Sequence, residues 1–184
     1  VWFYNQGWQA HEFQQKCWEA LANGESGILN APTGYGKTFA IWFGVLAQYY
    51  AKEALQEKKI KKKTLHTLWI TPLRALSKEI HKATSQVSQD LDLDYEIELR
   101  TGDTTVANRQ RQRKNPPQAL ITTPESVHLI LATKEGQDYF KYLEFIIIDE
   151  WHELLGSKRG VLIELALSRL KAINPNLKIW GISA

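Results

Sequence analysis

The chain has 184 residues, of which 43% are hydrophobic and 23% are charged, so fibrous and intrinsically disordered proteins are excluded. This length is sufficient for one substantial hydrophobic core and does not require a second domain. The net charge of +3 favours anionic partners only weakly and is well below that of a dedicated nucleic-acid module.

The single cysteine, Cys17, excludes an intrachain disulfide and suits a reducing compartment. It lies on the apolar face of a predicted helix, where we expect a buried side chain rather than a reactive thiol. The sequence contains no secretory pattern and no run of 18 apolar residues, so we expect no membrane contact and a cytoplasmic location. Because the chain contains no methionine, even at position 1, we expect residues 1–184 to be a piece of a longer protein.

The first 21 residues are rich in aromatic side chains, and a helix is predicted to begin near His11. Most of the aromatic residues are expected in the core: Trp2, Phe3, Tyr4, Trp8, Phe13 and Trp18. Gln14, on the predicted helix, offers one donor and one acceptor group that can pair with both edges of an adenine base. An exposed helical glutamine explains it equally well.

Residues 31–38, Ala-Pro-Thr-Gly-Tyr-Gly-Lys-Thr, match the phosphate-binding loop G-x-x-x-x-G-K-[ST] at every position except the first, which is alanine. A strand is predicted at 26–30 and a helix from near Lys37, which is the context that this motif requires. The two glycines of the loop allow backbone amides to turn toward phosphate oxygens. Lys37 can reach the outer phosphates, and the Thr38 hydroxyl can bind Mg²⁺. The sequence predicts a nucleotide site formed by Pro32, Thr33, Gly34, Tyr35, Gly36, Lys37 and Thr38.

Strands and helices alternate through the rest of the chain, which predicts an α/β fold with a mostly parallel sheet and helices on both faces. The run Phe-Ile-Ile-Ile at 145–148 is typical of a strand that is buried on both faces. Strands are predicted at 65–70, 95–100, 119–121, 143–148 and 178–182. Helices are predicted at 73–91, around 109–114, from 125 and at 160–173.

Two basic segments interrupt this pattern. The run at 58–63 contains five lysines, and we expect a solvent-exposed loop rather than a nucleic-acid contact. The short helix that carries Arg109, Arg111, Arg113 and Lys114 is likewise expected to present a solvated face.

Polar residues follow each predicted strand, and the carboxyl ends of parallel strands meet at one edge of the sheet. Asp149 and Glu150 follow an entirely apolar strand, where a buried charge requires a partner. We therefore assign Asp149 to a magnesium ion and Glu150 to the orientation and deprotonation of an attacking water molecule. The alternative is an acidic pair that caps a helix. His152 is close enough to respond to the nucleotide and to contact another site as well.

These motifs, taken in order, resemble those of the superfamily 2 helicases along the whole chain. The motif residues are Gln14, 31–38, 71–74, 101–102, 123–125, 149–152 and 183–184. The segment from Asp149 to Gly160 further resembles the Lhr-type helicases, especially the bacterial ligase-associated DEXH-box branch. Ala10 departs from the pattern, because the family's adenine motif usually has proline there.

The resemblance implies a RecA-like P-loop NTPase lobe, the first of two lobes of an ATP-dependent DNA helicase that moves 3′ to 5′ and acts in repair. In that family Gln14 would read adenine, Lys37 and Thr38 would hold phosphate and Mg²⁺, and His152 and Ser183 would couple ATP to strand movement. Other matched positions would contact the nucleic-acid backbone, although the threonines among them could simply end strands. These are Thr71, Arg74, Thr101, Gly102 and Thr123.

The resemblance also implies partners. The second lobe would supply arginines to the terminal phosphate, so residues 1–184 alone are expected to hydrolyse ATP weakly or not at all. Single-stranded or partly duplex DNA and DNA-repair proteins are the expected partners. A nucleotide-dependent binding module that does not translocate remains open, because the distinguishing feature, a second lobe with arginine motifs, lies outside these residues. An RNA helicase lobe also remains open, because no residue in the sequence is an evident reader of the 2′-hydroxyl.

Overall fold

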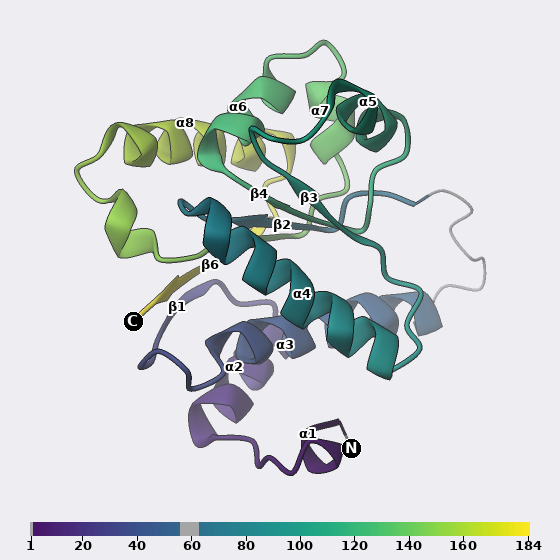
Figure 1. The fold of residues 1–184 in the computed structure, drawn as a ribbon, viewed down its shortest axis with the longest axis vertical. Helices are drawn as coiled ribbons and strands as arrows, with labels where there is room; N and C mark the ends of the chain where they lie inside the picture. The colour runs from purple at the N-terminus through teal and green to yellow at the C-terminus, as the bar shows by residue number, and fades with distance from the viewer. Residues whose placement is uncertain (1, 56–62) are drawn as a thin grey trace.

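A computed structural model describes residues 2–55 and 63–184 of the chain. Within these residues, six strands form one parallel sheet in the order β1-β6-β5-β2-β4-β3 (Figure 1). The strands are β1 (Gly27–Asn30), β2 (Thr67–Ile70), β3 (Ile97–Arg100), β4 (Ala119–Thr122), β5 (Phe145–Ile148) and β6 (Lys178–Ser183). The expected α/β class is confirmed, and every pair of neighbouring strands in this sheet is parallel.

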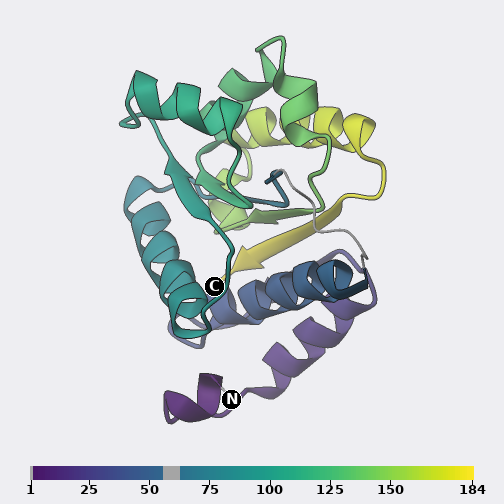
Figure 2. The same cartoon turned by 90° about the vertical axis from the view of Figure 1, so that its right-hand side faces the viewer.

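Helices cover both faces of the sheet (Figures 1 and 2). On one face lie α2 (Glu12–Ala22), α3 (Lys37–Leu55) and α4 (Arg74–Asp90), with α1 (Trp2–Asn5) next to them. On the other face lie α6 (Pro124–Leu131), α7 (Gly136–Phe140) and α8 (Lys158–Ile173). Helix α5 (Val106–Lys114) follows the edge strand β3, and the short 3-10 helix η1 (Trp151–Leu154) follows β5.

The alternation of side chains along β2 separates two hydrophobic cores. Trp69 points toward α3 and packs near Trp42, with 6.4 Å between ring centroids. Leu68 and Ile70 point to the opposite face and join the core beneath α6, α7 and α8. Successive side chains in a strand face opposite sides, so one buried strand contributes to both cores. This arrangement fixes β2 and β5 rigidly in the middle of the sheet.

The N-terminal aromatic residues differ from expectation. Trp2 is buried, but Tyr4 and Trp8 are 84% and 47% exposed, and the remaining three are only half-buried. These rings pack mainly against one another and against the outer side of α3. For example, the ring centroids of Trp8 and Phe39 lie 5.8 Å apart. Trp2 belongs to the core, and Phe3 and Phe13 pack against its margin. Only one of the six is thus fully buried, so the expectation that most are core was wrong.

The structure also tests the expectations for the cysteine and for the number of helices. Cys17 is buried, and burial raises the pKa of its thiol to about 12, so the expected inert cysteine is confirmed. Helices α1, α7 and η1 were not predicted, because segments of four or five residues carry too little periodicity. None of the helices in residues 2–55 and 63–184 is both long and apolar enough to cross a bilayer.

Of the lysine run at 58–63, positions 58–62 lie outside the described residues. Lys63 is described, and its ammonium group lies 3.1 Å from a carboxylate oxygen of Asp94 and 3.5 Å from one of Glu96. Its positive charge is thus matched by two acidic side chains on the surface.

Candidate functional site

The phosphate-binding loop has the backbone that its sequence predicts. Gly34 and Gly36 have φ of +83° and +81°, a region that residues with a Cβ rarely adopt. Ala31 has no positive φ, which explains why alanine is tolerated in place of the first glycine of the motif. Helix α3 begins at Lys37, and the Lys37 ammonium group donates a hydrogen bond to the Ala31 carbonyl across the loop. The helix N-terminus thus faces the loop, as an anion site requires.

Gln14 is buried and ties α2 to this loop. Its Nε2 donates to the Gly36 carbonyl at 3.1 Å, and its Oε1 accepts from the His11 amide at 2.9 Å. A Cβ at position 36 would lie 2.8 Å from the Gln14 Nε2, so a larger residue there would displace the Gln14 amide in addition to straining the backbone. One N–H and one lone pair of the amide remain available to a ligand.

A cavity of about 230 Å³ opens beside Gln14, between α2, the loop and the N-terminal aromatic residues. Its walls are Phe3, Trp8, Gln9, His11, Gln14, Gly34, Tyr35, Gly36 and Phe39. Flat aromatic walls with the side-chain amides of Gln9 and Gln14 suit a nucleobase, and the cavity adjoins the phosphate loop. Phe3 and Trp8 thus line this cavity, which their sequence pattern did not reveal.

Asp149 lies at the carboxyl end of β5 and is buried. Its Oδ2 accepts from the Trp69 Nε1 at 3.2 Å, and its Oδ1 accepts from the Glu150 amide at 3.0 Å. Burial raises the pKa of this carboxyl to about 6, while Trp69 and the nearby Lys37 act in the opposite direction. Lys37 makes the smallest of these contributions, and its sign is that of a cation at the same edge of the sheet.

Magnesium fits these residues. A buried carboxylate that is held by only two donors gains from a nearby cation, and the Thr38 hydroxyl is a second oxygen ligand on the first turn of α3. Within the described ranges no three acidic, histidine or cysteine side chains gather to hold a metal by themselves.

Glu150 has a left-handed backbone, with φ 48° and ψ 44°, which is rare for a residue with a side chain. Such strain often marks functional sites, and here it turns the chain sharply away from β5. The next side chain, Trp151, packs over β6, where a Cβ on Gly181 would lie 3.1 Å from the indole. His152 lies between two carboxylates, with 3.5 Å from Nδ1 to Glu150 and 3.5 Å from Nε2 to Glu153.

Strand β6 separates β1 from β5 and brings the two motifs to one edge of the sheet. Asn30 pairs with Ser183, and Ile148 pairs with Gly181. The last residues of β1 and β5 are therefore within about two residues of each other in register along β6. The Ser183 carbonyl accepts from the Ala31 amide at 3.3 Å. Ser183 is therefore in direct contact with the start of the phosphate loop.

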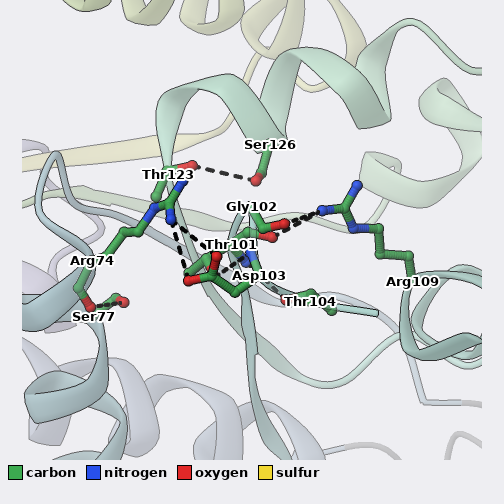
Figure 3. Close-up of polar contacts among 9 residues, drawn as sticks. All are labelled: Arg74, Ser77, Thr101, Gly102, Asp103, Thr104, Arg109, Thr123 and Ser126. Carbon is green, nitrogen blue, oxygen red and sulfur yellow. Dashed lines mark hydrogen bonds and ion pairs between the residues drawn. The ribbon is translucent and has the colours of Figure 1, made fainter. Parts of the chain in front are cut away.

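A second group of polar residues lies farther along the same edge, at the ends of β3 and β4 and at the start of α4 (Figure 3). The Arg74 Nη1 contacts the Asp103 carboxylate at 3.0 and 3.3 Å. From the other side, the Arg109 Nη2 donates to the carbonyls of Thr101 and Gly102 at 3.2 and 2.8 Å. Two arginines thus hold the 101–103 loop between them.

The predicted threonines differ in exposure. Thr71 is fully buried, and its hydroxyl accepts from the Leu73 amide at 3.4 Å, so it ends β2 and offers no side chain to a ligand. The predicted role of Thr71 as a nucleic-acid contact is therefore not supported. The Thr123 hydroxyl lies 3.3 Å from that of Ser126 at the start of α6 and is also largely buried, whereas Thr101 is half-exposed.

Three contributors to these sites were missed in the sequence. Trp69, the donor to Asp149, resembled any apolar strand residue, and Asp103 resembled part of a turn. The solvated face expected for this helix is confirmed for Arg111, Arg113 and Lys114, which are exposed, whereas Arg109 is half-buried and its guanidinium donates to two carbonyls. Each of these contacts joins residues on different elements, and only the fold brings them together.

The family model for DEAD/DEAH box helicases matches residues 11–184. The chain is 32% identical to the Lhr helicase/uracil glycosylase of Escherichia coli over 195 residues, covering 100% of the chain and 13% of that protein. It is 29% identical to the ATP-dependent helicase Lhr-Core of Methanothermobacter thermautotrophicus, covering 89% of the chain and 20% of that protein. The chain thus spans a fifth or less of the length of these relatives.

A solved structure shows the same fold. The chain resembles the Mycobacterium smegmatis helicase Lhr bound to ssDNA and AMP-PNP with a TM-score of 0.76 and 27% identity, covering 99% of the chain and 24% of that structure. The resemblance confirms the RecA-like helicase lobe that the motifs imply.

Proposed function

The chain belongs to the DEAD/DEAH box helicase family, and we propose that it is the ATP-binding motor lobe of a Lhr-type, ATP-dependent DNA helicase. The observation that carries the proposal is the shared edge of the sheet. The phosphate loop follows β1, the Asp149-Glu150 pair follows β5, and Lys37 influences the pKa of Asp149. A cation, a carboxylate and a helix N-terminus at one edge of the sheet support the proposal that phosphate binds between them.

ATP binding is divided between two neighbouring regions. The base enters the aromatic cavity, where Gln14 offers its remaining N–H and lone pair, while Pro32, Thr33 and Tyr35 shape the entrance to the loop. The amides of residues 34–38 and the start of α3 receive the phosphates. Lys37 exchanges the Ala31 carbonyl for a phosphate oxygen, which replaces a neutral acceptor by a charged one.

Hydrolysis requires a base near the terminal phosphate. Glu150 is only half-buried and lies directly beyond Asp149, so it can accept a proton from the attacking water. Thr38 and Asp149 would hold Mg²⁺, which supplies charge neutralisation at the phosphates. His152 contacts Glu150 and Ser183 contacts the loop, and we assign both to the transmission of the nucleotide state.

Nucleic acid binds at the second group of residues on the same edge. Arg74, Thr101 and Gly102 offer one guanidinium, one hydroxyl and a backbone segment, which are contacts that position a strand without reading its sequence. The largely buried Thr123 lies beside them, with its hydroxyl toward Ser126. The solved structure of a 27% identical Lhr helicase contains ssDNA, which supports DNA as the track.

The parent protein completes the motor. We assign residues 1–184 to the first of two RecA-like lobes and the missing arginine contacts to the second. The proposal has three further parts, which the motif resemblance supports. The helicase moves from 3′ to 5′, it belongs to the ligase-associated branch, and it acts in DNA repair in the cytoplasm.

The test is the ATPase rate of the parent protein with and without single-stranded nucleic acid. We expect Mg²⁺-dependent hydrolysis that single-stranded DNA stimulates more than RNA of the same length and sequence. A rate that nucleic acid leaves unchanged would remove the motor assignment.

A further inference from the structure

Arg159 lies in the first turn of α8, where the helix itself disfavours a positive charge. Ser157 caps this helix by accepting from the Gly160 amide at 3.0 Å. The first turn contains Lys158 and Arg159 and no acidic residue. Because the N-terminus of a helix carries partial positive charge, a cation here is unfavourable unless it gains contacts elsewhere.

Arg159 has such contacts on two other elements. Its Nε lies 2.6 Å from the Glu125 Oε1, and its Nη1 lies 2.8 Å from the Pro72 carbonyl oxygen. Glu125 lies in the first turn of α6, just after Thr123, and Pro72 lies in the loop that leads to Arg74. One guanidinium therefore joins two of the three segments that carry the proposed nucleic-acid contacts, those of Arg74 and Thr123.

The contact with Glu125 is electrostatically favourable. Burial raises the pKa of Glu125, but hydrogen bonds from its own amide, Arg159 and Thr123 together lower it below its usual value. Because both side chains of the ion pair are about half-exposed, the pair contributes little to stability. Its significance lies in which two elements it joins.

The segment that leads to Arg159 begins at the ATP site. After Glu150 the chain enters η1, where Trp151 packs over Gly181 and Leu154 is buried. The Ser157 hydroxyl donates to the Leu154 carbonyl at 2.7 Å, which ties the start of α8 to η1. The path from Glu150 to Arg159 is thus held at several points along its length.

From this arrangement we propose that Arg159 is a positioning residue that links the hydrolytic Glu150 segment to the nucleic-acid loops at Pro72 and Glu125. The inference rests on the proposed function. A displacement of the Glu150 segment is carried through Arg159 to both loops, and by reciprocity a bound strand biases the position of Glu150. Lysine cannot replace the arginine fully, because a single ammonium group lacks the planar fork that spans two acceptors.

The experiment measures ATP turnover of the parent protein with and without saturating single-stranded DNA, together with thermal unfolding. For Arg159→Ala we expect DNA-free turnover and the KM for ATP within about twofold of wild type. The ratio of DNA-saturated to DNA-free turnover should fall about threefold or more, within the range reported for mutations along coupling networks. Arg159→Lys and Glu125→Gln, which each retain part of the link, should give intermediate ratios.

Lys158→Ala is the matched control, because it removes a positive charge from the same turn of α8 without removing either contact. An unchanged ratio in Arg159→Ala, or an equal fall in Lys158→Ala, would overturn the inference. A parallel fall of DNA-free and DNA-saturated turnover with a lower unfolding temperature would also overturn it, because Arg159 would then only stabilise the fold. A wild-type protein without any DNA stimulation would instead count against the proposed function.

Discussion

The guanidinium of Arg74 is held by the carboxylate of Asp103, with 3.0 Å between Nη1 and Oδ1. Both side chains are mostly exposed, and Gly102 allows the guanidinium to lie over the loop, since a Cβ there would be 2.7 Å from the Arg74 Nη2 (Figure 3). A strand phosphate that binds Arg74 therefore competes with a carboxylate that is already in place.

This competition predicts opposite effects for the two partners in single-strand binding. Arg74→Ala should weaken binding uniformly across sequences and reduce the salt slope by about 0.7, the value for one phosphate contact on a single strand. Asp103→Asn should strengthen binding, because the carboxylate no longer competes with the phosphate for Arg74. The gain should be only about two- to fivefold, because an exposed ion pair contributes little free energy. Titrations at several salt concentrations measure both. Weaker binding by Asp103→Asn would show that the carboxylate positions Arg74 instead.

A second prediction concerns nucleotide affinity. Lys37→Ala should lower the affinity for ATP about ten- to a hundredfold, because a charged hydrogen bond to phosphate is lost. The unfolding temperature should change little, since the ammonium group of Lys37 now binds only the Ala31 carbonyl. Lys16→Ala, on the exposed side of α2, is the control and should bind ATP normally. Equal affinities in both variants would exclude a phosphate contact for Lys37.

A third prediction separates binding from turnover. Glu150→Gln in the parent protein should retain ATP binding and lose a hundredfold or more of its turnover, since general base catalysis contributes about 10²- to 10⁴-fold. Glu153→Gln is a close control, because both carboxylates lie 3.5 Å from the ring of His152 but only Glu150 follows the buried strand β5. Normal steady-state hydrolysis by Glu150→Gln would assign the base to another residue.

A fourth prediction concerns pH and stability at the opposite end of the sheet. Burial lowers the pKa of His66 to about 4, although Glu144 opposes this, so the folded protein keeps the ring neutral where the unfolded chain protonates it. The contribution of His66 to the free energy of unfolding is therefore complete above about pH 6.5 and is lost as the pH falls toward 4. About 2 kcal/mol of it is lost at pH 5.

Chemical denaturation at pH 7 and pH 5 measures this loss. His66→Asn lacks the titrating ring and should lose about 2 kcal/mol less than wild type between the two values. The exposed His11→Asn serves as control and should behave as wild type. A loss in His66→Asn as large as in wild type would mean that other groups cause the acid sensitivity.

The sequence was sufficient to predict the features that depend on residues close together in the chain. The phosphate loop was predictable because Gly34 and Gly36 supply the two positive φ angles in the same short segment that supplies Lys37. The strand at 145–148 was predictable because a run of four apolar residues suits only a doubly buried position. Parallel strands then required that Asp149 reach the same edge as the loop.

The contacts that could not be predicted join distant segments. Trp69 and Asp149 meet only because β2 and β5 are neighbours in the sheet, and no local pattern marks an indole as a donor. The exposed aromatic residues near Trp8 were misplaced because the hydrophobicity of a ring does not distinguish a core from the wall of an open cavity. Burial of Thr71 likewise depends on the packing around β2.

The most direct measurement is a structure of the parent protein with Mg²⁺ and a non-hydrolysable ATP analogue. We expect the base in the cavity beside Gln14, the phosphates on the amides of residues 34–38, and the metal next to Thr38 and Asp149. A nucleotide bound elsewhere, or a terminal phosphate remote from Glu150, would contradict the account.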